Sequence, residues 1–139
     1  ATCFAWCHKL SLLNTLPEGL IDIMTYAFDS CALETVEIPS SVSRVLNNAF
    51  GNMSTLKEVR FNSNVSNLPT IDYNAFINSG PVELNVPWTK DQHNKFVGTY
   101  TINNNTYNKD IFFGAKIGSK LIFSDGNVLE KAEEVVPNV

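Results

Sequence analysis

Charged residues are scarce in this chain of 139 residues. Only 17% of the residues are Asp, Glu, Lys or Arg, and the formal net charge is −4. A surface that binds nucleic acid needs a basic patch that stands out from its background. The sequence has no such patch, so we expect no nucleic-acid partner.

Long apolar runs are also missing. No segment approaches the roughly 20 consecutive apolar residues that a membrane-spanning helix needs, so we expect no membrane insertion. The chain opens on ATCFAWC, without an initiating Met and without a charged-then-apolar leader. We interpret it as part of a longer chain in which further repeats or another domain precede the first residue.

Residues suited to catalysis or metal binding are few. The chain has two histidines, His8 and His93, and three cysteines, Cys3, Cys7 and Cys31. Cys-x3-Cys followed directly by His fits neither a zinc ribbon nor a haem attachment motif. The sequence also has no glycine-rich phosphate loop and no nucleophile elbow. We predict a protein that is not an enzyme, with no metal site and no cofactor.

The sequence does contain an internal repeat. Phe recurs after Ala or Cys at intervals of 24, 22 and 26 residues, at Phe4, Phe28, Phe50 and Phe76. The segment AFDSCALETVEIP (27–39) matches AFINSGPVELNVP (75–87) without a gap. One repeat of this size cannot bury its own apolar residues, so equivalent residues of neighbouring repeats must stack.

Each repeat also carries a short alternating segment that predicts a strand. Val36-Glu37-Ile38, Val59-Arg60-Phe61 and Leu84-Asn85-Val86 place apolar residues inward and polar residues outward. Two outward rows follow from this alternation, one of Glu37, Arg60 and Asn85, and one beside it of Thr35, Glu58 and Glu83. These six residues are our candidate ligand-binding residues.

The cysteines fit the same repeat. Cys7 and Cys31 each stand three residues after a repeat Phe, at a position that Met53 and Ser79 also fill. We therefore interpret the cysteines as small buried hydrophobic residues. Adjacent strands lie about 4.8 Å apart, which a disulfide can bridge, so a bond between Cys7 and Cys31 stays open.

These elements together resemble the BspA-like, or treponemal-type, leucine-rich repeat. VEIPSSVSRVLNNAF (36–50) follows that motif almost position for position, and the resemblance covers about residues 3–87. It implies an α/β-type solenoid that is predominantly β. The expected form is a right-handed coil of about four repeats with a parallel sheet on its concave side. Members of the family are typically bacterial or protozoan surface or secreted proteins that bind host matrix proteins or other cells.

The chain divides into three parts in this interpretation. Residues 1–87 hold the repeats, residues 88–126 form a C-terminal β cap, and residues 127–139 form a short helix or linker tail. In the cap, TYTINNNTYN (99–108) predicts a hairpin, and KLIF (120–123) predicts a final strand. The tail has apolar residues at helical spacing.

Two functions remain open. The first is a non-enzymatic protein-binding repeat module of a bacterial surface or secreted protein, extracellular or on the cell surface, that takes part in adhesion or in host or cell interaction. The alternative is a structural or receptor-binding part of a phage or prophage virion. It rests on VPW (86–88) and FFGAKIGSKLIFSDG (112–126), which resemble the ends of repeat arrays in phage tail and gut-bacterial proteins.

Three triplets match the N-glycosylation rule, starting at Asn52, Asn64 and Asn104. The chain has seventeen asparagines, and at that frequency such triplets arise by chance. Chance is the interpretation that the sequence alone favours.

Overall fold

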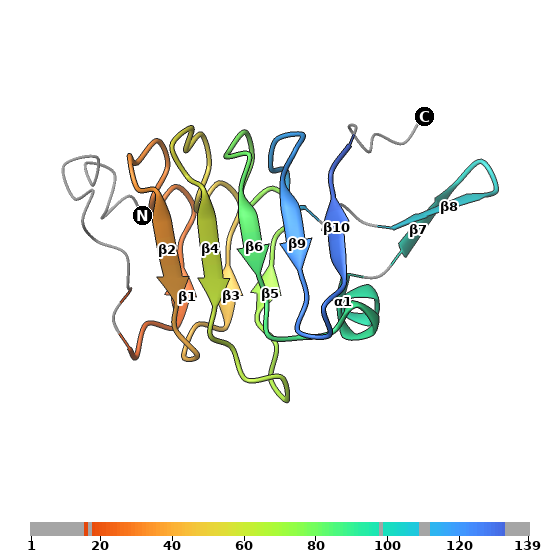
Figure 1. The fold of residues 1–139 in the computed structure, drawn as a ribbon, viewed down its shortest axis with the longest axis horizontal. Coiled ribbons are helices and arrows are strands. Elements are labelled where there is room, and N and C mark those ends of the chain that lie inside the picture. The colour runs from red at the N-terminus through yellow and green to blue at the C-terminus, as the bar shows by residue number, and fades with distance from the viewer. Residues whose placement is uncertain (1–15, 17, 98, 109–111, 133–139) are drawn as a thin grey trace.

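The structure, a computed structural model, describes residues 16, 18–97, 99–108 and 112–132. Within them most of the regular elements are strands, and there is one short helix (Figure 1). The elements in chain order are β1 (Asp22–Ile23), β2 (Thr35–Ile38), β3 (Arg44–Val45), β4 (Glu58–Phe61), β5 (Thr70–Ile71), β6 (Glu83–Asn85), α1 (Lys90–Val97), β7 (Thr99–Ile102), β8 (Asn105–Asn108), β9 (Lys120–Ile122) and β10 (Val128–Glu130).

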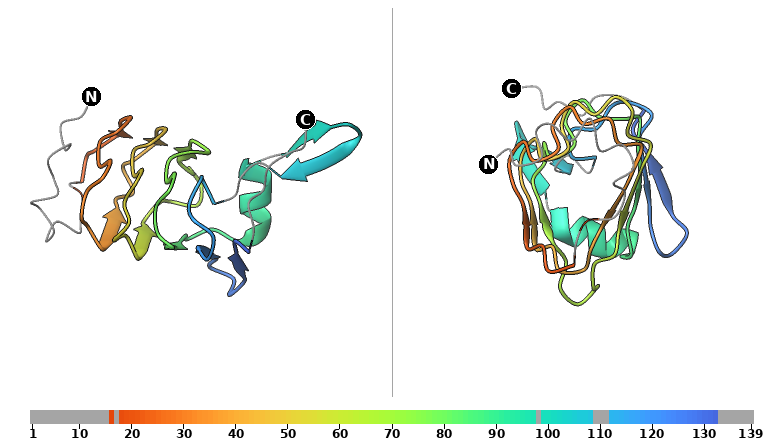
Figure 2. Two further views of the ribbon diagram at one scale, coloured as in Figure 1. Left: turned by 90° about the horizontal axis from the view of Figure 1, so that it is seen from above. Right: turned by 90° about the vertical axis from the view of Figure 1, so that its left-hand side faces the viewer.

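Apart from β7 and β8, which pair only with each other, the strands form two sheets that run along the length of the molecule. The larger sheet has the order β10-β9-β6-β4-β2, and the smaller one has the order β1-β3-β5. All neighbours in both sheets are parallel except β10, which pairs antiparallel with β9. Successive repeats contribute one strand to each sheet, so the repeats lie side by side in one view and overlap in the end-on view (Figure 2).

The register of the sheets follows the repeat in the sequence. In the larger sheet Val36 pairs with Val59, and Val59 pairs with Leu84. In the smaller sheet Ile23 pairs with Val45, which pairs with Ile71. Each set holds one equivalent apolar position from three successive repeats, and all six residues are buried. The stacking of equivalent residues is therefore what places the strands in register.

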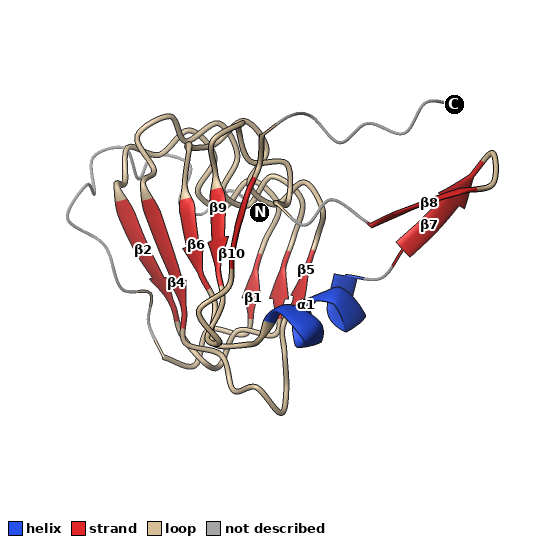
Figure 3. Ribbon diagram, turned by 45° about the vertical axis from the view of Figure 1, so that its right-hand side comes forward, coloured by secondary structure: helices blue, strands red, loops and turns tan. Residues whose placement is uncertain are grey.

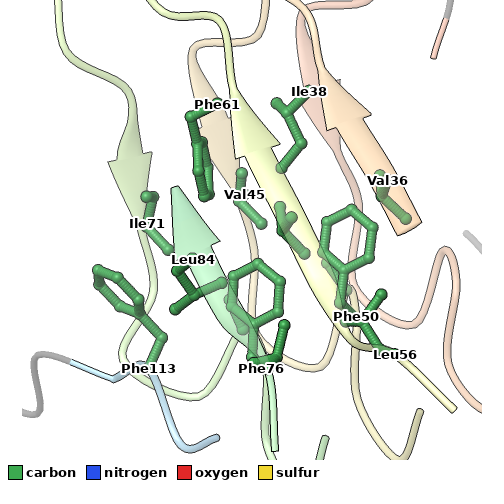
Figure 4. Packing of buried hydrophobic residues seen from close by; sticks show 14 of the residues in the cluster. Val36, Ile38, Val45, Phe50, Leu56, Phe61, Ile71, Phe76, Leu84 and Phe113 are labelled. Atoms are coloured by element: carbon green, nitrogen blue, oxygen red, sulfur yellow. The ribbon is translucent and has the colours of Figure 1, made fainter. Parts of the chain in front are cut away.

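The core lies between the two sheets and contains a column of aromatic rings (Figure 4). Phe28 stacks on Phe50 with ring centroids 5.2 Å apart, and Phe50 stacks on Phe76 at 5.1 Å. Phe113 continues the column at 6.4 Å, with its ring tilted by 50°. All four side chains are buried. These ring separations are close to the spacing of neighbouring strands, so one ring per repeat fills the column.

The repeat pattern resumes after an insertion, although the sequence interpretation ends it at Trp88. β9 pairs parallel with β6, and Leu121 faces Leu84 in register. In the chain, α1 and the antiparallel hairpin of β7 and β8 come between β6 and β9, and the hairpin projects from the end of the stack (Figure 3). Residues 112–123 thus add a further rung to the larger sheet.

Two expectations about particular residues need correction. Residues 128–130 form strand β10 and not the start of a helix or linker, because Val128 and Leu129 pair with Ile122 and Leu121 of β9. Cys31 is buried, as expected, but it is disulfide-bonded and so is not simply a small hydrophobic residue. Cys3 and Cys7 lie outside the described residues, as do Phe4, the N-terminal end, and most of the tail.

Candidate functional site

The outward face of the larger sheet holds the six candidate ligand-binding residues. Thr35, Glu58 and Glu83 are register partners across β2, β4 and β6, and so are Glu37, Arg60 and Asn85. The residues between them in each strand are buried, which turns both rows outward. The structure therefore brings the six residues together as two adjacent rows on one face. We call this surface the sheet face.

Arg60 is at the centre of the polar contacts on the sheet face. Its guanidinium lies 4.0 Å from Glu37 Oε1 and 3.9 Å from Glu58 Oε2. Asn85 Nδ2 donates a hydrogen bond to the same Glu58 oxygen at 3.3 Å. The Arg60 side chain is 52% exposed, and both ion pairs are long. Such pairs contribute little to stability, so these groups can re-pair with a partner at small cost.

Glu83 differs from the other acidic residues of the sheet face. Among the described residues it has no ion pair or hydrogen bond from its side chain. Its register partner on β9 is Lys120, but Lys120 Nζ lies 3.8 Å from Glu130 Oε1 on β10. The Glu83 carboxylate is exposed and is available to a positively charged group.

The row of Glu37, Arg60 and Asn85 continues onto apolar residues that sequence reasoning missed. Asn85 pairs with Ile122 on β9, and Ile122 pairs with Val128 on β10. Val128 is 53% exposed. The alternation of polar and apolar residues in KLI (120–122) is sufficient to predict that Ile122 points outward with Lys120. The strand that carries Val128 is not predicted, because the apolar residues of the tail have a helical spacing. The sheet face therefore has a polar part over β2, β4 and β6 and an apolar pair at its C-terminal end.

Two tighter ion pairs lie outside the two rows. Lys57 Nζ is 2.8 Å from Glu34 Oε1, and this hydrogen bond holds the pKa of Glu34 below its ordinary value. Arg44 binds both carboxylate oxygens of Asp22, at 2.9 and 2.8 Å, on the outer side of the smaller sheet. The hydrogen bond from Arg44 likewise lowers the pKa of Asp22. Both pairs link neighbouring repeats.

His93 is a buried residue of α1 that packs against the last repeat. Its side chain is fully buried, and its Nδ1 accepts a hydrogen bond from Trp88 Nε1 at 3.0 Å. Its ring stacks on Trp88 and meets the edges of Phe113 and Phe123. Burial lowers the pKa of His93 to about 4, so the imidazole is neutral at neutral pH. These contacts fasten α1 to the last repeat.

The described residues offer no cluster for a metal. No group of three or more His, Cys, Asp or Glu side chains is placed to hold an ion in the part of the chain that the structure covers. In the same part, no helix is long and apolar enough to cross a membrane. The arrangement of exposed side chains on the described strands suits recognition of another molecule by a broad surface.

Comparison with known protein families agrees with the repeat architecture. The family model described as "BspA type Leucine rich repeat region" matches residues 1–109 in six copies. This match extends beyond the stretch of about residues 3–87 on which the four Phe units are recognised in the sequence. Neither a curated protein nor a solved structure matches the chain.

Proposed function

The chain belongs to the BspA-type leucine-rich repeat family, and we propose that it is the protein-binding module of a bacterial surface or secreted protein that acts in adhesion or host interaction. Repeats of this kind are protein-interaction modules without enzymatic activity. The partner in this proposal is a protein of a host or of another cell. It is held on the sheet face by Thr35, Glu37, Glu58, Arg60, Glu83 and Asn85.

The observation that carries the proposal is the continuity of the sheet face. Five hydrogen-bonded strands give an extended surface without a break in register from β2 to β10. Its ion pairs are long and exposed, so a partner can exchange them without breaking a buried contact. Ile122 and Val128 supply apolar area beside the polar rows, and apolar contact is what usually anchors an interface.

The disulfide at Cys31 supports the extracellular part of the proposal. Disulfides persist in oxidising surroundings and are rare in the reducing cytosol. Cys31 itself is buried in the core, and the other two cysteines of the chain lie outside the described residues. A stack of repeats with an open edge gains stability from a disulfide.

The virion interpretation is based on residues that already have a structural role in the core of the fold. Trp88 is fully buried against His93 and Phe61. Phe112, Phe113 and Ala115 are buried in the last repeat. These residues are needed to finish the stack in a surface protein as much as in a tail subunit. We therefore favour the first function, in which α1 and the last rung cap the repeats of a solenoid.

The binding proposal is tested by replacing Glu37, Glu58 and Arg60 together with Ala. We expect the triple variant to fold and to lose binding to an immobilised extracellular-matrix preparation, measured by biolayer interferometry. Asp22, Arg44 and Asp72 lie on and beside the smaller sheet, and replacing these three with Ala is the matched control. It removes the same two acids and one base, so the net charge changes equally. Equal binding by the two variants would refute the sheet face as the site.

A further inference from the structure

Two glutamates of the sheet face lie directly across from each other on neighbouring strands. Glu58 of β4 and Glu83 of β6 are register partners, and like charges at such positions destabilise a sheet. The chain compensates Glu58, because Arg60 lies 3.9 Å from its Oε2 and Asn85 Nδ2 donates to the same oxygen. The Glu83 side chain is exposed and has no ion pair or hydrogen bond among the described residues. A cation from outside the chain would therefore relieve a repulsion that the fold leaves in place.

The charge around Glu83 is negative on balance. Its register partner on β9 is Lys120, but the Lys120 amine lies 3.8 Å from Glu130 Oε1 on β10 and so already neutralises that carboxylate. The outward positions of the five strands hold four acids and two bases, namely Glu37, Glu58, Glu83 and Glu130, and Arg60 and Lys120. Charge complementarity therefore favours a cationic partner over an anionic one.

Apolar side chains lie beside Glu83 on the same face, where β6, β9 and β10 are neighbours (Figure 1). Ile122 of β9 pairs with Asn85, which follows Glu83 by two residues, and Val128 of β10 pairs with Ile122. Ile122 is half-buried, and Val128 is 53% exposed. The C-terminal end of the sheet face thus offers a carboxylate and, diagonally across from it, an apolar pair.

The spacing between these groups matches that of an extended peptide. Neighbouring strands lie about 4.8 Å apart and rise about 3.3 Å per residue, which places Glu83 and Ile122 roughly 8 Å apart. Residues i and i+2 of an extended segment point to the same side and lie about 6–7 Å apart. The flexible stem of a Lys side chain makes up the difference.

We propose that the partner binds this end of the sheet face with an extended segment in which a Lys or Arg stands two residues from a Leu, Ile or Val. The cation pairs with Glu83, and the apolar side chain covers Ile122 and Val128. Apolar contact supplies most of the affinity, and the ion pair fixes the orientation of the segment. This inference rests on the proposed function, because it names the chemistry of the partner that the sheet face binds.

The test uses the full chain labelled with nitrogen-15 and the synthetic peptide acetyl-TSKTLTS-amide, whose Thr residues favour an extended backbone. Three control peptides replace Lys with Glu, replace Leu with Ser, or place Lys and Leu next to each other so that they point to opposite sides. We expect saturable shifts of the amide signals of β6, β9 and β10 with the first peptide. Binding should be about tenfold weaker without the Leu side chain and about threefold weaker without the cation.

Variants of the chain locate the two contacts. Glu83→Gln and Val128→Ser should weaken binding of the Lys–Leu peptide by the same factors, about threefold and about tenfold. The matched controls are Glu18→Gln, at an exposed carboxylate ahead of β1, and Val65→Ser, at a side chain that is 48% exposed in the loop between β4 and β5. Both controls should bind as the unchanged chain does. Amide signals of residues far from each substitution check that every variant is folded.

A charge swap tests the ion pair directly, because Glu83→Lys should prefer the peptide with Glu in place of Lys. The proposal is overturned if the Lys–Leu peptide does not bind, if the Lys and Glu peptides bind the unchanged chain equally, or if the two variants bind as tightly as their controls. None of these results bears on the matrix-binding test of the sheet face, which uses different variants and no peptide. A failure of the partner chemistry and a failure of the proposed function are therefore distinguishable.

Discussion

Lowering the pH from 7.5 to 4 should destabilise the protein through His93. Burial lowers the pKa of His93 from 6.5 to about 4. In the unfolded chain the imidazole takes up a proton near pH 6.5, whereas in the folded chain it stays neutral down to about pH 4. Between these values the unfolded state holds more protons, so the free energy of unfolding falls as the pH falls. The hydrogen bond between the two rings supports this direction. Trp88 Nε1–H donates to His93 Nδ1, so a proton added to Nδ1 would face the indole N–H and the hydrogen bond would be lost.

The size of the effect follows from the shift. Each unit of pKa difference corresponds to about 1.4 kcal/mol, so the loss between pH 6.5 and pH 4 is about 3 kcal/mol. This is a large fraction of the stability of a single domain, which is about 5–15 kcal/mol. The loss should be complete near pH 4, and the full stability from His93 should be present above pH 6.5.

The measurement is urea unfolding at a series of pH values, followed by Trp fluorescence. The control is His93→Gln, in which a neutral amide oxygen can still accept the Trp88 N–H. Both chains carry His8→Gln, so that His93 is the one histidine in the comparison. Lowered carboxyl pKa values, such as that of Asp22, act equally in both chains and cancel in the difference. Parallel stability curves for the two chains between pH 6.5 and 4 would refute the reasoning.

Three further substitutions test the packing. Phe50→Ala opens the middle of the ring column and should cost about 3–5 kcal/mol in denaturant unfolding, whereas Tyr73→Ala, at a side chain that is 61% exposed, should cost far less. Ser79→Ala removes a buried hydroxyl that accepts from the Met53 N–H and lies within hydrogen-bond distance of the Phe50 and Ile77 carbonyls, and it should cost about 1–3 kcal/mol. Ser79→Cys keeps a weak donor and should cost less, and the reverse order would contradict the role of these hydrogen bonds. Thr89→Ala removes the N-cap of α1, where the Gln92 N–H donates to the Thr89 hydroxyl, and should lower the free energy of unfolding by about 1 kcal/mol. Unchanged amide hydrogen exchange in α1 would argue against this capping role.

The family and the strand register could be predicted from the sequence because the repeat is strict. Val36, Val59 and Leu84 stand at one position of the repeat, and a parallel stack pairs them directly. The outward rows then follow from the two-residue period of a strand. That these rows bind a partner stays a prediction, since alternation decides which side chains are exposed and says nothing about what they contact.

The end of the stack was harder to predict. Thr89 and Gln92 form a capping box, in which each side chain bonds the backbone N–H of the other. This T-x-x-Q signal is sufficient to locate α1, whereas the β cap expected for this segment contains no helix. The disulfide at Cys31 could not be decided, because the chain has three cysteines and spacing alone does not choose among their pairings.

The insertion after Trp88 shows why the constant spacing of a repeat can be interrupted in the sequence while the stacking of the strands continues in the fold. Glu83 lies 25 residues after its register partner Glu58, and Lys120 lies 37 residues after Glu83. Each rung of a stack contacts only its neighbours, so α1 and the hairpin can be inserted in the connection without changing the register. A search for a constant period stops at Trp88 for this reason. The sheet face, in contrast, continues to Ile122 and Val128. Its apolar end is recognised only from the pairing of the strands in the structure.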